Sequence, residues 1–175
     1  MPNAGKSTLI SRCSAARPKI ADYPFTTLEP VLGIVELSDF RRFVMADIPG
    51  LIEGAHAGAG LGHDFLKHIE RTKILVHILD IMPTDGSDPV QNYHTIRSEL
   101  EQYSKPLAAK AEIIVANKID LDPNGEAVAH LKEKLSTEVH PISAVTGQGI
   151  RELRELLWQR VKELKAPSQT DQVPL

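Results

Sequence analysis

A stretch near the start of the chain combines residue types that bind phosphate groups. It reads Asn3-Ala4-Gly5-Lys6-Ser7-Thr8 and matches the second half of the pattern Gly-x-x-x-x-Gly-Lys-[Ser/Thr]. Backbone N–H groups of such a loop, and of the helix N-terminus that follows it, bind phosphate oxygens. Lys6 would reach the β- and γ-phosphates, and the Ser7 hydroxyl would bind Mg²⁺. A chance Gly-Lys-Ser sequence at the start of a helix is the alternative interpretation.

A second group of residues could complete a site for Mg²⁺ and a γ-phosphate. The segment Asp47-Ile48-Pro49-Gly50 follows a predicted strand, which is where the magnesium-binding aspartate of such sites lies. Asp47 would hold Mg²⁺ through water, and Gly50 would donate its N–H to the γ-phosphate. Of Thr26 and Thr27 in the preceding loop, Thr27 is the better candidate to complete the magnesium shell. An ordinary Pro-Gly turn is the alternative for this segment.

A third group follows another predicted strand and could recognise a base. It reads Asn117-Lys118-Ile119-Asp120. Guanine presents an N1–H and an exocyclic amino group on one edge, and a single carboxylate, here Asp120, can accept from both. Adenine lacks this pair of donors, and polar mismatches of this kind can discriminate by about 10⁴-fold or more. Lys118 would lie over the base, and the backbone N–H of Ala144 would bond the guanine oxygen. A solvated loop is the alternative, but it does not account for the position at a strand end.

Alternating helices and strands can bring these groups to one edge of a sheet. Apolar spacing predicts helices over 4–16, 61–69, 90–103, 128–135 and 150–164, with a loop at 18–27. Strands are predicted over 31–37, 41–47, 74–79, 113–116 and 139–142, the first two as an antiparallel hairpin. The fold class is therefore α/β, with a mostly parallel sheet and one antiparallel edge. Ligands of such sheets bind beyond the carboxyl ends of the strands, where the polar groups above lie.

Composition indicates one soluble globular domain. The chain has 175 residues, 42% hydrophobic and 25% charged, and its formal net charge of −3 gives no case for wholesale binding of nucleic acid. The single cysteine, Cys13, fits a reducing compartment, and its helical spacing favours burial over reactivity. No apolar run is long enough to span a membrane, so we expect a cytoplasmic monomer without membrane contact. The seven histidines lack metal-site spacing, and His77 is predicted to be a hydrogen-bonded core residue.

The order of the motifs resembles that of the translation-factor-related GTPases, whose five signatures are Gly-Lys-Ser, a loop threonine, Asp-x-x-Gly, Asn-Lys-x-Asp and Ser-Ala. Longer runs resemble the Obg family more specifically. They are Ala-Asp-Tyr-Pro-Phe-Thr-Thr-Leu at 21–28, Asp-Ile-Pro-Gly-Leu-Ile-Glu-Gly-Ala at 47–55, Gly-Leu-Gly-His at 60–63 and Phe-Leu-x-His-Ile-Glu-Arg at 65–71. The eukaryotic relatives of Obg are the nearest alternative, but the run at 60–63 fits Obg better.

The resemblance covers residues 1 to about 165 and implies a P-loop NTPase domain with a Ras-like sheet and helices on both faces. It implies a slow GTP-hydrolysing switch that binds Mg²⁺ and GTP or GDP and acts in assembly of the large ribosomal subunit. Segments 19–28 and 50–62 would change order with the nucleotide and report it to a ribosomal partner. The nucleotide-binding residues carried over are Asn3, Ala4, Gly5, Lys6, Ser7, Thr8, Phe25, Thr26, Thr27, Asp47, Ile48, Pro49, Gly50, Asn117, Lys118, Asp120, Ser143, Ala144 and Val145.

Obg proteins also carry a glycine-rich domain before the GTPase domain. That domain, the first strand of the sheet and the first glycine of the phosphate loop are absent from this chain, which we therefore expect to be a fragment. The 175-residue chain would then be a truncated domain that folds poorly and binds GTP weakly. Residues 166–175 contain two prolines and no apolar pattern, and are predicted to be a disordered tail or linker.

One departure from Ras-like enzymes concerns the hydrolytic water. Leu51 follows Asp-x-x-Gly, where the Ras type has a glutamine that orients the water. Asn3 matches the position at which related GTPases bind K⁺ beside the phosphates, and such a cation could supply positive charge in the transition state. Lys6, Thr27, Gly50 and Asn3 are therefore the predicted catalytic residues. The alternatives are that Asn3 only shapes the turn, that the protein is a non-catalytic sensor of guanine nucleotides, or that it is an ATPase of the same fold, against which Asp120 argues.

Overall fold

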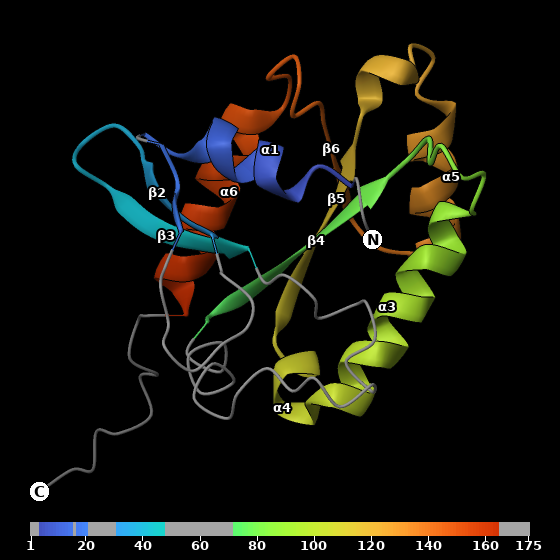
Figure 1. Ribbon diagram of the computed structural model, residues 1–175, viewed down its shortest axis with the longest axis horizontal. Coiled ribbons are helices and arrows are strands. Elements are labelled where there is room, and N and C mark those ends of the chain that lie inside the picture. Colours follow the sequence, from blue (N-terminus) through green and yellow to red (C-terminus); the bar gives the residue numbers. More distant parts are fainter. Residues whose placement is uncertain (1–3, 16, 21–30, 48–71, 165–175) are drawn as a thin grey trace, which may run out of the picture.

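The computed structural model describes residues 4–15, 17–20, 31–47 and 72–164. Within these ranges the strands form two three-stranded sheets, one in the order β1-β2-β3 and the other in the order β4-β5-β6. Figure 1 shows the first sheet beside helices α1 and α6, and the second between α6 and the pair α3 and α5. The architecture is α/β, as the sequence predicts.

The parallel sheet carries the ends at which the site is expected. It consists of β4 (Ile74–Asp80), β5 (Ala111–Asn117) and β6 (Val139–Ile142). In the parallel register Asp80 pairs with Asn117, and Asn117 pairs with Ile142. All three strands therefore end side by side. Their side chains are largely apolar and buried, as is typical of parallel strands covered on both faces.

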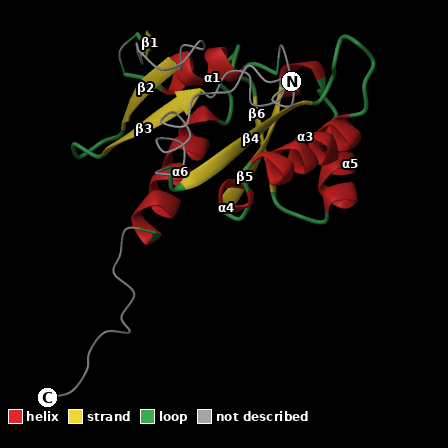
Figure 2. Cartoon of the chain, turned by 60° about the horizontal axis from the view of Figure 1, so that its bottom comes forward, coloured by secondary structure: helices red, strands yellow, loops and turns green. Residues whose placement is uncertain are grey.

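Helices cover both faces of this sheet. On one face, α3 (Pro89–Tyr103) and α5 (Glu126–Leu135) pack against it (Figure 2), and Leu79, Ile114 and Leu131 share one apolar cluster. On the other face lie α1 (Lys6–Cys13) and α6 (Ile150–Glu163). The alternation of side chains along a strand sends successive residues to opposite clusters.

The antiparallel sheet packs into the apolar cluster on the face of the parallel sheet that α1 and α6 cover. It consists of β1 (Lys19–Ile20), β2 (Val31–Glu36) and β3 (Arg42–Asp47). Val35 of β2 is fully buried and packs in one cluster with Leu9 of α1, Val115 of β5 and Leu157 of α6. That shared core holds the hairpin against the rest of the domain and brings the end of β3 toward the start of α1.

Several boundaries differ from the sequence prediction. The first helix spans Lys6–Cys13 instead of 4–16, because Gly5 is left-handed and Ser14 is extended and bridges Val35. The predicted loop at 18–27 contains the two-residue strand β1, which is too short for a periodic signal. The helix α4 (Lys105–Ala108) and a 3₁₀ turn, η1 (Ile119–Leu121), were not predicted for the same reason.

The pairing of the strands tests the predicted sheet. The hairpin of 31–37 and 41–47 is confirmed at 31–36 and 42–47. However, among the described residues β3 and β4 do not pair, so the antiparallel strands form a separate sheet. A strand between those ending at Asp47 and Asp80 is what the Ras-like arrangement calls for, and it stays a prediction. The helix predicted at 61–69 lies outside the described residues.

His77 is a core histidine, as predicted. Its Nδ1 lies 2.9 Å from Oε1 of Glu112, and its ring stacks on Tyr93 with centroids 4.9 Å apart. The Tyr93 hydroxyl donates to Oε2 of Glu112. Burial raises the pKa of Glu112, but the hydrogen bond from His77 and the charge of Arg97 outweigh it, so the pKa lies below its ordinary value. This cluster stabilises the contact of α3 with the sheet.

Cys13 is a buried residue of α1, as its spacing indicates. It is 1% exposed, and burial raises the pKa of its thiol to about 11. Because the thiolate is the reactive form, this cysteine has a packing role.

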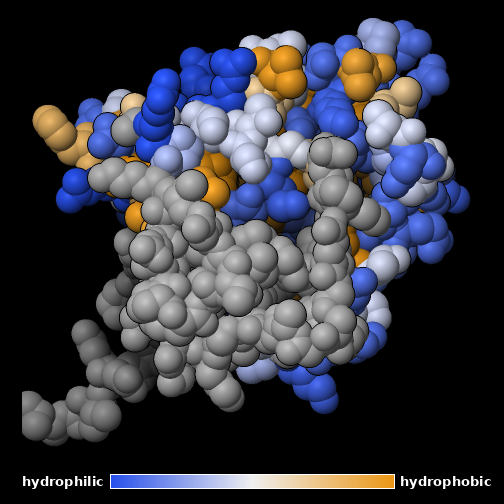
Figure 3. All heavy atoms as spheres, in the orientation of Figure 1, coloured by the Kyte–Doolittle hydropathy of each residue, from blue (hydrophilic) through white to orange (hydrophobic). Residues whose placement is uncertain are grey.

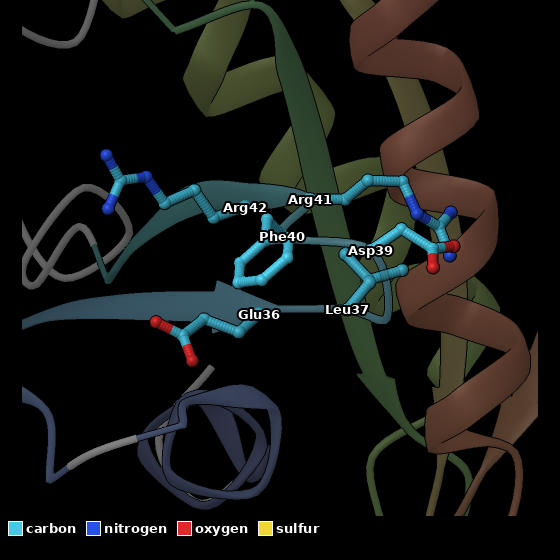
Figure 4. Close-up of a pocket in the computed structure, with 6 residues that line it drawn as sticks. All are labelled: Glu36, Leu37, Asp39, Phe40, Arg41 and Arg42. Carbon is cyan, nitrogen blue, oxygen red and sulfur yellow. The ribbon is translucent and has the colours of Figure 1, made fainter.

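The tip of the β2–β3 hairpin is bonded to α6, and the residue types in its turn are unfavourable for the backbone conformation that they adopt. Arg41 donates two hydrogen bonds to the Glu155 carboxylate, from Nη1 at 2.7 Å and from Nη2 at 3.1 Å. Figure 4 shows Arg41 directed toward the helix, with Phe40 on the hairpin side. The central turn residues Asp39 and Phe40 have φ of 62° and 58°, a conformation that favours asparagine and glycine.

Replacing Phe40 by glycine is expected to stabilise the protein by on the order of 1 kcal/mol, because glycine adopts positive φ without the Cβ clash. Urea unfolding would measure the change. Phe40→Ala is the matched control, since it also removes the fully exposed ring but keeps a Cβ at the strained position. Equal stabilisation by both variants would show that the ring, and not the backbone, is responsible.

Candidate functional site

The segment predicted to bind phosphate forms a turn that leads directly into α1. Gly5 is the N-cap residue and has φ 92°, while Lys6 and Ser7 are the first helical residues. Leu9 N donates to Gly5 O at 2.8 Å, which sets the first helical turn. No side chain in the described ranges caps this terminus. Its N–H groups, together with the helix dipole, form a site suited to an anion.

Asn117 connects this turn to the loop after β6. Its side-chain Nδ2 donates to the Ala4 carbonyl at 2.8 Å, and its Oδ1 accepts from the N–H of Ala144 at 2.9 Å. The residue is 2% exposed, so both bonds lie in the interior. A Cβ placed on Gly5 would lie 2.3 Å from Asn117 Nδ2. The Asn117 side chain therefore bonds to the protein backbone and holds the two loops in a fixed position relative to each other.

Ser7 and Asp47 come together at the start of α1 and the end of β3. The Ser7 hydroxyl lies 3.5 Å from Asp47 Oδ2, at the outer limit of a hydrogen bond. Asp47 is 9% exposed. Its Oδ1 is buried and has no hydrogen-bond partner among the described residues. A hydroxyl beside a carboxylate with an unused buried oxygen is a donor set that fits Mg²⁺.

Lys118 and Asp120 lie just beyond the end of β5. Lys118 has a left-handed backbone with φ 73°, and its Nζ lies 2.5 Å from Oδ2 of Asp80 at the end of β4. Oδ1 of Asp80 accepts from the N–H of Met82, so the carboxylate is itself held in place. Asp120 lies in η1 and is exposed. The ion pair therefore positions the lysine, and the acidic side chain beside it faces solvent.

The loop after β6 is tightly folded. Ser143 is fully buried; its N–H donates to Gln148 O at 3.0 Å, and its hydroxyl accepts from the N–H of Thr146 at 3.1 Å. Ala144 is buried, whereas Val145 is 63% exposed. Arg12 of α1 donates from Nε to the Ala144 carbonyl at 3.0 Å, and from Nη2 to the Val145 carbonyl.

The structure thus brings together most of the predicted residues that it describes. The turn at 4–8, Asp47, Asn117, Lys118, Asp120 and the loop at 143–145 lie at one end of the domain, although Thr8 contributes an exposed side chain of α1. The predicted residues outside the described ranges are Asn3, Phe25, Thr26, Thr27, Ile48, Pro49 and Gly50.

Two residues of this region were not singled out from the sequence. Asp80 carried a usable signal, because it is an acidic residue at the carboxyl end of a buried strand. Arg12 carried none, because a basic residue in the last turn of a helix is common.

A shallow hollow at the hairpin tip is unrelated to these loops. Its lining consists of Glu36, Leu37, Asp39, Phe40, Arg41 and Arg42, none of which belongs to the predicted site.

Figure 3 shows hydrophilic residues over much of the described surface on the face that it draws, with hydrophobic ones in small separate groups. The described ranges contain no cluster of three or more His, Cys, Asp or Glu side chains able to hold a metal. None of the described helices has the length and apolar character that crossing a membrane requires.

Comparison with known proteins identifies the family. A family model described as 50S ribosome-binding GTPase matches residues 1–118. GTPase Obg of Aquifex aeolicus is 55% identical over 168 residues, covering 94% of this chain and 49% of that protein. GTPase Obg of Bacillus pumilus is 53% identical over 176 residues, covering 99% and 40%. The chain belongs to the Obg family of 50S ribosome-binding GTPases. This Obg-family chain spans about half or less of the length of these curated relatives.

Solved structures confirm the P-loop GTPase fold of the Obg-family chain. Era in complex with MgGDPNP and nucleotides 1506–1542 of 16S ribosomal RNA gives a TM-score of 0.66 at 25% identity, covering 99% of this chain and 56% of that one. The cytosolic domain of the T. maritima FeoB iron transporter in its GMPPNP form gives 0.62 at 20% identity, covering 95% and 62%. At that identity the second likeness supports the fold alone.

Proposed function

We propose that this chain is the GTPase domain of an Obg-type switch, with residues 1–165 as the domain and 166–175 as a tail or linker. It would bind GTP and GDP with Mg²⁺ and hydrolyse GTP slowly. The observation that carries the proposal is the Asn117 amide, which bonds Ala4 in the phosphate turn and Ala144 in the loop after β6. The two loops that would contact the two ends of one nucleotide are thereby held at a fixed separation.

The phosphate end of the nucleotide would lie on the turn before α1. The N–H groups that follow Gly5 and the positive end of the helix dipole favour the negative phosphate oxygens. Ser7 and Asp47 would hold Mg²⁺, with Thr27 as a further ligand; the ion would neutralise charge between the β- and γ-phosphates. Lys6 would contact the same oxygens.

The base end would lie against the carboxyl ends of β5 and β6. Asp120 is exposed beside this edge and would accept from the two donors of guanine. The Lys118 stem, held by Asp80, would cover one face of the base. The Ala144 backbone and the neighbouring Ser143 and Val145 would complete the base pocket.

Hydrolysis requires a group that replaces the missing glutamine at Leu51. We propose that Asn3 holds K⁺ next to the phosphates, where its charge would stabilise the transition state. Single-turnover hydrolysis in Mg²⁺ is therefore expected to be at least about tenfold faster in potassium than in sodium, as removal of one charge-stabilising group typically costs about 10²–10³-fold.

Asn3→Ala should abolish this difference between the two salts while leaving GTP binding measurable. Equal rates in both salts for the unaltered protein would contradict the cation role. Tight GTP binding with no hydrolysis in either salt would instead favour the sensor of guanine nucleotides.

The partner we propose is the large ribosomal subunit, in the cytoplasm. The support is the family, whose model is described as 50S ribosome-binding, together with the Obg relatives. Sedimentation with purified 50S subunits in GTP, GDP and no nucleotide would test it. Nucleotide-independent sedimentation, or none, would contradict a switch that reports its nucleotide to the subunit.

A further inference from the structure

Arg12 makes contacts that differ from those of an ordinary basic residue at a helix end. Such residues usually interact with the last carbonyl groups of their own helix. Arg12 instead reaches a loop 132 residues further along the chain, where Nε donates to Ala144 O at 3.0 Å and Nη2 donates to Val145 O. Two neighbouring carbonyl groups are thus bound by one planar fork of donors.

These bonds complete the hold on the base-contacting loop. The Ala144 N–H is bound from within by Asn117 Oδ1 at 2.9 Å, and the Ala144 carbonyl is bound from α1 by Arg12 at 3.0 Å. Both polar groups of the same residue are therefore fixed by side chains from different elements. The peptide groups before and after Ala144 are each held by one side chain, and Arg12 also binds the carbonyl of the next peptide group.

The element that carries Arg12 also begins at the phosphate turn. Gly5 caps α1, which runs from Lys6 to Cys13, and Arg12 lies in its last turn. Because a helix of this length is rigid, its two ends move together. The contact at Arg12 therefore relates the position of the base loop to that of the phosphate turn along a path that does not involve Asn117.

We propose that Arg12 is a positioning residue that sets the base-contacting loop at 144–145 for recognition of the 6-oxygen of guanine. This inference rests on the proposed function. Arg12 acts through the loop and not by touching the nucleotide, since its donors are directed at the two carbonyl groups. Its removal frees the Ala144 carbonyl, and with it the N–H of Val145 in the same peptide group, whereas the Ala144 N–H stays bound to Asn117.

The test compares nucleotides with and without a 6-oxygen. Arg12→Ala is expected to weaken binding of GTP by about tenfold, because hydrogen bonds with a charged partner are the stronger ones. Binding of 2-aminopurine riboside triphosphate, which lacks the 6-oxygen, should change by less than about twofold, since it makes no contact that the loop must align. Arg12→Lys should restore part of the GTP affinity because lysine can donate to one of the carbonyl groups.

Arg151→Ala is the matched control, because Arg151 is an arginine of α6 whose side chain is 89% exposed. It should bind both nucleotides as the unaltered protein does. Equal weakening of both nucleotides by Arg12→Ala, or no weakening, would overturn the positioning role. If the unaltered protein bound no GTP, the proposed function itself would fail. If Arg12→Ala does not fold, Arg12→Lys gives the same comparison, with a smaller selective loss expected for GTP.

Discussion

Replacing Asp120 by asparagine is expected to lower the affinity for GTP by about 10²–10⁴-fold and to create affinity for xanthosine triphosphate. The carboxylate would accept from the N1–H and the amino group of guanine, and an amide cannot accept from both. Xanthine has a carbonyl in place of the amino group, so it accepts a hydrogen bond from the new amide. Mismatches between buried polar groups produce discrimination of this size. Competition binding with a fluorescent GDP analogue would measure both affinities.

The change in base selectivity must be separated from a loss of charge. Glu126→Gln removes one exposed carboxylate from the first turn of α5, six residues after Asp120. This variant should leave both affinities unaltered. If Asp120→Asn bound GTP as the unaltered protein does, Asp120 would have no role in base recognition. Loss of GTP without any gain for the xanthine nucleotide would indicate damage to the loop instead.

Replacing Gly5 by alanine is expected to abolish measurable GTP binding and to lower the free energy of unfolding by about 3 kcal/mol or more. Two costs add. The backbone of Gly5 has φ 92°, and strained backbone conformations cost about 1–3 kcal/mol. The new Cβ would also lie 2.3 Å from Asn117 Nδ2, and displacing that amide leaves buried polar groups without partners at about 1–3 kcal/mol.

Gly86→Ala separates these two costs. Gly86 has a comparable φ of 71°, but a Cβ there meets no atom within 4 Å. Its variant should therefore show the cost of the backbone alone and retain GTP binding. Urea unfolding and nucleotide titration of both variants would measure the difference. Equal losses of stability in the two proteins would show that the contact with Asn117 has no energetic weight.

The sequence predicts the parts of this fold that depend on local pattern. The strands β4, β5 and β6 and the hairpin of β2 and β3 were located within a few residues. Burial on both faces produces a continuous apolar run, and burial on one face produces an alternating pattern. The helix α6 is confirmed for the same reason. The short elements β1, α4 and η1 contain too few residues to leave such a record.

The candidate site likewise has a part that the sequence predicts and a part that it does not. Motif residues such as Lys6, Asp47 and Asp120 follow from chemistry and spacing. The bonds from Asn117 to Ala4 and Ala144 could not be predicted, because they join side chain to backbone between segments far apart in the sequence.

In the proposed function, the amide of Asn117 would make the two ends of the nucleotide-binding site behave as one bivalent receptor. A ligand that engages the phosphate turn presents its base to the second loop at an effective concentration set by their fixed separation. Because the Asn117 bonds hold that separation before any ligand arrives, little ordering remains to oppose the second contact. Guanosine and inorganic pyrophosphate would each bind weakly here, whereas a molecule that joins them by a linker of the right length would gain far more than either contact supplies separately.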